Sequence, residues 1–364
     1  MTTRVFSISI ALGLAVMLAA TVSAGQQNQN RADGEIHVLP VQGNIYMLIG
    51  AGSNIALSVG IDGALFVDTG REEMTDKVLA TARTLAAALT STAYPPRPCV
   101  GVGCAAGPGS GSYTQWGWSS PAINQLISSP NPPVSIRYII NTSFDADHTG
   151  GNVKISAAGR TLTGGNVSRG VGGSGEGAEM WAHETVLNRM TEKMTDERGW
   201  PTGTYYTPKY KMNGFFNGEG IELIHAPAAH TDGDTIVYFR YSDVISAGDI
   251  FSTSGYPPID LDSGGSIQGI IDGLNKILDI AIPQFRAQGG TYIIPGHGRL
   301  SDYGDVANYR NMVVKIRDRI QDNIKSGMTL QQVKAARPTL DFDGRYGSPD
   351  TFIEAVYRSL SEKK

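Results

Sequence analysis

Charge is scarce in this sequence, and neither sign dominates. Charged residues fill 18% of the 364 positions, against roughly 25% in an average globular chain. The 30 basic and 34 acidic residues leave a net charge of −4. This balance excludes a nucleic-acid binder that works through bulk positive charge. Because 41% of the residues are hydrophobic, the chain can bury a core, and wholesale disorder is not expected.

Long apolar runs are missing after the first 24 residues. Residues 1–24 place Arg4 before the apolar stretch Ile8–Ala20, and the small residues Val22-Ser23-Ala24 follow. This order is typical of a cleaved secretory signal peptide, and no later segment fits a stop-transfer helix. The alternative is an uncleaved membrane anchor. We therefore expect a periplasmic or secreted protein, with residues 25–364 forming the mature domain and making no membrane contact.

Cysteine is almost absent, and the only two lie close together. Cys99 and Cys104 bound the segment CVGVGC. In an oxidising compartment such a pair can close a small disulfide loop. The rival interpretation makes them metal ligands, but there is no second pair and no nearby His.

Two motifs of other enzyme classes are absent or out of context. No Gly-x-Ser-x-Gly elbow of a serine hydrolase occurs. Residues 170–175 fit GxGxxG, but no strand leads into them, so dinucleotide binding is not expected.

Glycine, in contrast, is abundant. The 45 Gly and 18 Pro exclude a coiled coil or a helical bundle and indicate a soluble, loop-rich globular protein of one large or two ordinary domains. Two long loops are expected, an insertion at 91–134 and a glycine-rich segment at 164–177. A helical extension is expected over about 310–364.

Short apolar runs and helical spacings alternate along the rest of the chain. Residues 36–70 predict an antiparallel meander, because short strands alternate with Gly-rich turns. The spacing then predicts helices over 72–89, 179–194, 266–281, 309–325 and 349–361, and strands over 136–141, 221–225, 235–239, 243–246 and 292–294.

Metal-binding residue types follow several of these strands. They occur in four segments, which are Ser143 to Asn152, Ala229 to Asp234, Ser246 to Asp249 and Pro295 to Gly298. Strand ends form a rigid platform that exposes such groups to a cleft. Imidazole and carboxylate together suit zinc or a similar first-row ion. One such segment is weak evidence, but four in this order predict a metal site.

These segments resemble the metallo-β-lactamase superfamily over roughly residues 36–310. Gly52-Ser53-Asn54, Val67-Asp68-Thr69-Gly70 and Asp147-His148-Thr149-Gly150-Gly151-Asn152 support the resemblance. It implies an α/β (α+β) fold, the four-layer αββα sandwich with two mixed sheets between helices.

The resemblance also implies the ligands of two metals. The family loop reads His-x-His-x-Asp-His, and these four positions are Ser143, Asp145, Asp147 and His148 here, so both leading histidines are missing. The remaining family ligands match His230, Asp249 and His297. One ligand set is complete, namely Asp147, His148, Asp249 and His297. The other keeps His230 and the shared Asp249, with Asp145 as a carboxylate substitute and Ser143 a poor donor. We expect one firm Zn²⁺ site and a second site that is weak, empty or selective for a harder ion such as Mn²⁺.

The resemblance implies a zinc-dependent hydrolase that uses metal-activated water on a lactam, lactone, ester or thioester. Asp147 or Asp249 is the expected catalytic proton acceptor, and the partner is a small-molecule substrate. Four protein ligands, however, would close a tetrahedral zinc as in structural sites. The alternative is therefore a catalytically degenerate binding protein on the same fold. A redox variant with iron is less favoured, since no flavodoxin-like or cluster-binding segment follows.

Three other residues have non-ligand interpretations. Asp68 is expected to organise the metal loop by hydrogen bonding. His225 alternates along a strand and is expected to pack within the sheet. His183 lies in a predicted helix and is expected at the surface.

Overall fold

The computed structural model describes residues 34–93, 135–160, 177–194, 196–283 and 289–361. The predicted signal peptide, Cys99, Cys104, residues 94–134 of the insertion and residues 164–176 of the glycine-rich segment lie outside the described residues. Within these ranges, no helix combines the length and apolar character that a membrane span requires.

The first sheet has seven strands in chain order. These are β1 (His37–Gln42), β2 (Ile45–Ala51), β3 (Ser53–Gly60), β4 (Gly63–Val67), β5 (Ile136–Ile140), β6 (Glu179–His183) and β7 (Gly203–Tyr205). Strands β1 to β4 pair antiparallel, which confirms the predicted meander, and β4 to β7 pair parallel.

The second sheet has five strands in the order β12-β11-β10-β9-β8. They are β8 (Lys209–Lys211), β9 (Ile221–Ala226), β10 (Asp234–Phe239), β11 (Val244–Ser246) and β12 (Tyr292–Ile294). All neighbours pair antiparallel except β11 and β12.

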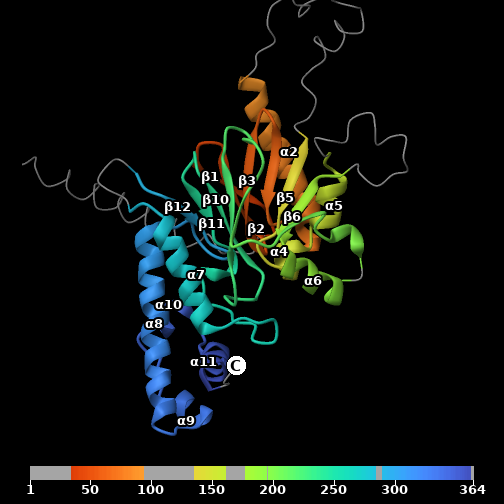
Figure 1. The fold of residues 1–364 in the computed structure, drawn as a ribbon. Helices are drawn as coiled ribbons and strands as arrows, with labels where there is room; N and C mark the ends of the chain where they lie inside the picture. Colours follow the sequence, from red (N-terminus) through yellow and green to blue (C-terminus); the bar gives the residue numbers. More distant parts are fainter. Residues whose placement is uncertain (1–33, 94–134, 161–176, 195, 284–288, 362–364) are drawn as a thin grey trace, which may run out of the picture.

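The two sheets pack face to face, and helices cover both outer faces (Figure 1). Successive side chains of β4 point to opposite faces of the sheet, so both faces are buried. Phe66 belongs to an outer core under the helices, and Val67 belongs to the core between the sheets. The first outer core includes α2 (Thr75–Ala93) and α5 (Asn152–Ala157). The second includes α7 (Ile267–Ile280), α8 (Tyr303–Lys325), α9 (Leu330–Ala335) and α11 (Asp350–Ser361). This is the predicted four-layer αββα sandwich.

The C-terminal helices continue beyond the sandwich (Figure 1). Helix α8 begins at Tyr303, six residues before the predicted start, and Asp302 caps it by accepting from the Asp305 amide. Short α10 (Asp343–Tyr346) lies between α9 and α11.

One predicted helix is partly wrong. Residues 179–183 form strand β6, and helix α6 runs only over Glu184–Lys193. Pairing with β5 and β7 outweighs the helical spacing here, because it places Met180 and Ala182 in the buried interior. The strands β7 and β8, three residues each, are too short to show a periodicity.

Candidate metal centre

The loop after β5 carries three of the predicted ligands on a short helical turn. Helix α4 (Ala146–Thr149) begins after Asp145, whose carbonyl accepts from the amides of His148 and Thr149 at 2.9 and 3.0 Å. This turn places Asp145, Asp147 and His148 within four residues of one another. Gly151 packs so closely under the turn that a Cβ there would lie 2.7 Å from the Thr69 carbonyl oxygen.

Asp68 holds this loop, as predicted. Its carboxylate accepts from the Thr142 amide at 2.8 Å and lies 2.8 Å from His148 Nδ1. Asp68 itself has φ +64°, an unfavourable conformation for a non-glycine residue that orients the carboxylate toward the loop. With Nδ1 engaged, the free ring nitrogen of His148 is Nε2.

Both sheets contribute to the centre, and the first two residues of β3 connect their loops by hydrogen bonds. Asn54 donates to the carbonyls of Pro295 and Gly298, at 2.9 and 3.0 Å, and Ser53 donates to the Asp147 carbonyl at 2.6 Å. These bonds fix the loop after β12 against the loop after β5.

Six donor residues converge in two groups whose ligand atoms lie within 4.8 Å of one another inside each group. The His148 group consists of Asp147, His148 and His297, and the His230 group consists of Asp145, His230 and Asp249. They include every residue that the sequence predicts as a ligand. Ser143 is fully buried beside the His230 group. Its hydroxyl accepts from the Asp145 amide at 3.3 Å.

Asp249 connects the two groups. Its Oδ1 lies 3.2 Å from His148 Nε2 and 3.3 Å from His297 Nε2, while its Oδ2 lies 3.9 Å from His230 Nε2. It sits on the 3-10 turn η6 (Gly248–Ile250) after β11. Gly296 makes this approach possible, since a Cβ at that position would collide with Asp249 Oδ1.

The donor set fits a metal cation. Among the described residues, His148 Nε2 and Asp249 Oδ1 are buried side-chain atoms that have no hydrogen-bond partner. Buried polar atoms are normally satisfied, so an orphaned pair that faces each other calls for a ligand. Imidazole nitrogen and carboxylate oxygen are the donors that zinc and other first-row ions accept.

The protonation equilibria show how strongly these groups interact. Burial favours the neutral imidazole, but Asp249 and Asp68 outweigh it and raise the pKa of His148 well above its usual range. Burial also opposes the charge on Asp249, yet His148 and His297 hold the pKa of that carboxyl well below its usual range. The carboxylates therefore stabilise positive charge at this place, whether on imidazole protons or on a cation.

The His230 group already contains a close internal pair. His230 Nε2 lies 2.9 Å from Asp145 Oδ2. Burial lowers the pKa of His230, but this hydrogen bond and the nearby carboxylates outweigh it and raise the pKa to about 9. Behind the group, buried Asp234 accepts from the Thr231 amide at 2.7 Å.

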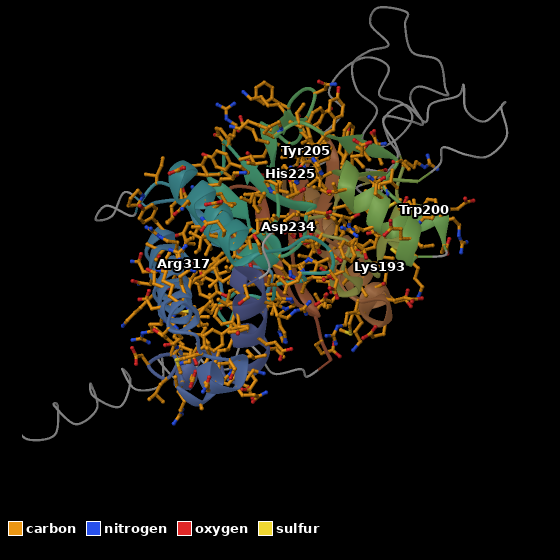
Figure 2. All side chains as sticks on the ribbon, turned by 60° about the horizontal axis from the view of Figure 1, so that its bottom comes forward. Lys193, Trp200, Tyr205, His225, Asp234 and Arg317 are labelled. Atoms are coloured by element: carbon orange, nitrogen blue, oxygen red, sulfur yellow. The ribbon has the colours of Figure 1, made fainter. Side chains whose placement is uncertain are left out.

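The prediction for His183 is wrong. It is 6% exposed at the end of β6, and its ring stacks on His225 with centroids 3.5 Å apart and planes 11° apart. Tyr205 packs edge-on against the same ring at 5.0 Å. Figure 2 labels Tyr205 and His225, whose rings both contact that of His183. The strand assignment explains the error, because a strand end between the sheets is buried where a surface helix is exposed. His225 packs within the sheet as expected.

Aromatic residues beside His230 were not predicted at all. Tyr256, Tyr346 and Phe352 cluster next to it, although Tyr256 is about a hundred positions away from the two others. The only indication in the sequence is the helical spacing over 349–361. It predicts that one side of this helix is buried but not which residues pack against it.

Comparisons with known proteins agree with this architecture. The metallo-beta-lactamase superfamily matches residues 117–297 of the sequence. No curated protein matches the chain. The solved structure of the stereoselective inverting sec-alkylsulfatase Pisa1 from Pseudomonas sp. is similar, with 14% sequence identity and a TM-score of 0.54. The match covers 89% of this chain and 50% of the sulfatase, so this chain spans half of that protein's length.

Metallo-beta-lactamase structures are also similar. That of DIM-1 matches at 13% identity and a TM-score of 0.48, over 77% of this chain and 97% of that one. The sequence match and the observed fold together show that the chain belongs to the metallo-β-lactamase superfamily.

Proposed function

We propose that this protein is an exported, zinc-dependent hydrolase that acts on a carbonyl-type substrate, namely a lactam, lactone, ester or thioester. One observation carries the proposal. Six His and Asp side chains from both sheets converge, and two of their buried atoms, His148 Nε2 and Asp249 Oδ1, face each other without hydrogen-bond partners. Export rests on the signal-like sequence of residues 1–24.

Asp147, His148, Asp249 and His297 would hold the principal metal ion, and Asp145 and His230 would hold any second ion. Bound Zn²⁺ supplies a Lewis acid for a carbonyl oxygen and lowers the pKa of water to about 7. The oxygen-rich His230 group favours a harder ion such as Mn²⁺.

The protein's own contribution is positioning and proton transfer. Asp68 fixes the ring of His148, so that Nε2 points at Asp249. Asp147 is the better proton acceptor of the two predicted carboxylates, because its side chain is 25% exposed, whereas that of Asp249 is 7% exposed and lies between imidazoles. A substrate can therefore reach Asp147.

A catalytically degenerate binding protein is the second candidate. It is favoured by Ser143 and Asp145 in place of imidazoles, and by a set of four protein ligands that can close a tetrahedral zinc site. Substrate turnover distinguishes the two functions.

Two measurements on purified protein test the proposal. After zinc loading and removal of free metal, elemental analysis should give about one zinc per chain, and under about 0.2 would overturn the zinc proposal. The matched variants are Asp249→Asn, which should lose the metal, and Asp272→Asn on the exposed face of α7, which should keep it.

A panel of a cephalosporin, a lactone, a thioester and a phosphodiester then tests hydrolysis. Turnover of a lactone or thioester that depends on zinc and on Asp147 supports the hydrolase. Full zinc occupancy without turnover of any substrate supports the binding protein.

A further inference from the structure

A cavity of about 460 Å³ opens beside the metal centre. The loop 255–260 forms one wall, and the C-terminal segment from α10 to α11 forms the other, with Tyr346, Thr351, Phe352 and Ala355 among the lining residues. The volume falls in the range of about 300–1,000 Å³ that is usual for small-molecule sites.

His230 belongs to both the cavity and the metal centre. Its Nδ1 lies 3.2 Å from the Pro258 carbonyl oxygen in the cavity wall, and its Nε2 lies 2.9 Å from Asp145 Oδ2 in the His230 group. The backbone fixes this arrangement, since the Asp260 amide donates to the His230 carbonyl at 2.9 Å. The cavity and the metal centre therefore adjoin at the ring of His230, which contacts the cavity wall through Nδ1 and the His230 group through Nε2.

The wall of the cavity is aromatic. The ring of Tyr256 stacks on that of Phe352, with centroids 5.0 Å apart and planes 8° apart, and lies 5.5 Å from that of Tyr346. The Tyr256 hydroxyl donates to Asp343 Oδ1 at 2.9 Å, so its polar end is engaged by α10. Tyr346 and Phe352 are 7% and 3% exposed. The cluster is thus held in place before any ligand binds.

The lining carries little charge. It contains His230 and Asp260 but neither Lys nor Arg. The Asp260 carboxylate accepts from the Ser263 amide at 3.0 Å and lies 3.9 Å from Lys193 Nζ, so a partner outside the lining offsets its charge. Without Lys or Arg and with an aromatic wall, the cavity suits an uncharged apolar group.

We propose that this cavity binds the uncharged acyl chain of the substrate, and that the C-terminal segment 346–355 thereby sets chain-length specificity. This proposal rests on the proposed hydrolase function and adds a substrate class to it. The reactive carbonyl group would lie at the six donors, and the chain would extend past His230 along Tyr256 and Phe352.

The first arm of the test measures kcat/KM for p-nitrophenyl acetate, butyrate, hexanoate and octanoate. The wild-type protein should gain about 3- to 4-fold per added methylene until the cavity is filled, the factor that corresponds to burying a methylene group. Ala355→Trp should fill the cavity and abolish this gain, so that kcat/KM no longer rises from the acetate to the octanoate. Glu354→Gln, on the exposed side of the same helix, is the matched control and should keep the gain.

The second arm measures binding without turnover. Isothermal titration calorimetry with octanamide and acetamide should show that wild type binds octanamide more tightly, and Ala355→Trp should lose this preference. Thr351→Trp provides a second, exposed position at the cavity in case Ala355→Trp fails to fold.

The two arms separate the two proposals. Octanamide binding that Ala355→Trp removes, without hydrolysis of any ester, supports the acyl-chain site and contradicts the hydrolase. Ester hydrolysis that is independent of chain length, with no preference for octanamide, overturns the acyl-chain site and leaves the hydrolase standing.

Discussion

The two donor groups differ in their proportion of imidazole to carboxylate, although the loop after β5 contributes residues to both. The His148 group has two imidazoles and one carboxylate, and Asp68 braces it from behind. The His230 group has one imidazole and two carboxylates, and its imidazole is already paired with Asp145. Two positions, Ser143 and Asp145, account for this difference. The His148 group therefore stays assembled in this chain although both leading histidines of the family loop are replaced.

Loss of the shared carboxylate should have the largest effect, because Asp249 contacts imidazoles of both groups. Asp249→Asn should lower zinc affinity by more than the roughly 10- to 100-fold that is typical for loss of an outer partner. Chelator competition measures it, with Asp272→Asn as control. Unchanged affinity would show that Asp249 is not a ligand.

Loss of Asp68 should affect the His148 group selectively. Asp68→Asn should weaken zinc binding by about 10- to 100-fold, because the partner that orients His148 and makes it a better donor is altered. The same competition experiment applies. If the competition resolves two zinc ions per chain and both lose affinity equally, the selective role of Asp68 is contradicted.

Restoring the family histidines should remove the difference between the groups. The double variant Ser143→His, Asp145→His should raise zinc content from about one to about two per chain after loading. Elemental analysis measures the content. If turnover appears in this variant while the parent has none, the parent is a degenerate binding protein. If the content stays near one, the missing donors do not limit the second site.

The smallest effect should come from a pair of histidines that belongs to neither group. Burial and the neighbouring His225 lower the pKa of His183 to about 4. The folded state therefore favours neutral His183, and the stability it contributes is complete above about pH 6.5 and is lost as the pH falls toward 4.

Thermal melts at about pH 7 and pH 5 test this pair. The Tm of wild type should fall by about 2–4 °C more than that of His183→Asn between the two values. Zinc content at pH 7 should be the same in both proteins. An equal Tm decrease would show that His183 titrates normally.

The residues of the candidate metal centre could be predicted from sequence because each lies in a loop or turn that follows a strand. The parallel pairs β4–β5 and β11–β12 place Asp68 next to the loop of His148 and Asp249 next to the loop of His297. The fold follows from the same strands and from the family motifs. Nine of the ten helices and strands predicted after residue 70 need no more than a shift of their ends, and only 179–194 is partly wrong.

Contacts between distant segments could not be predicted. The helical spacing over 179–194 predicts a helix at His183, and only pairing with β5 and β7 places this residue in a strand. The cavity depends on Tyr256 meeting Phe352 across 96 positions, and neither the Pro-rich loop nor the helix indicates its partner. Such contacts arise from tertiary packing, which local patterns do not encode.

The most direct test of the difference between the two groups is anomalous diffraction at the zinc edge from zinc-soaked crystals. We expect one strong peak in contact with Asp147, His148, Asp249 and His297, and a weaker one or none beside Asp145 and His230. Two peaks of equal occupancy, or a strong peak only beside Asp145 and His230, would contradict it.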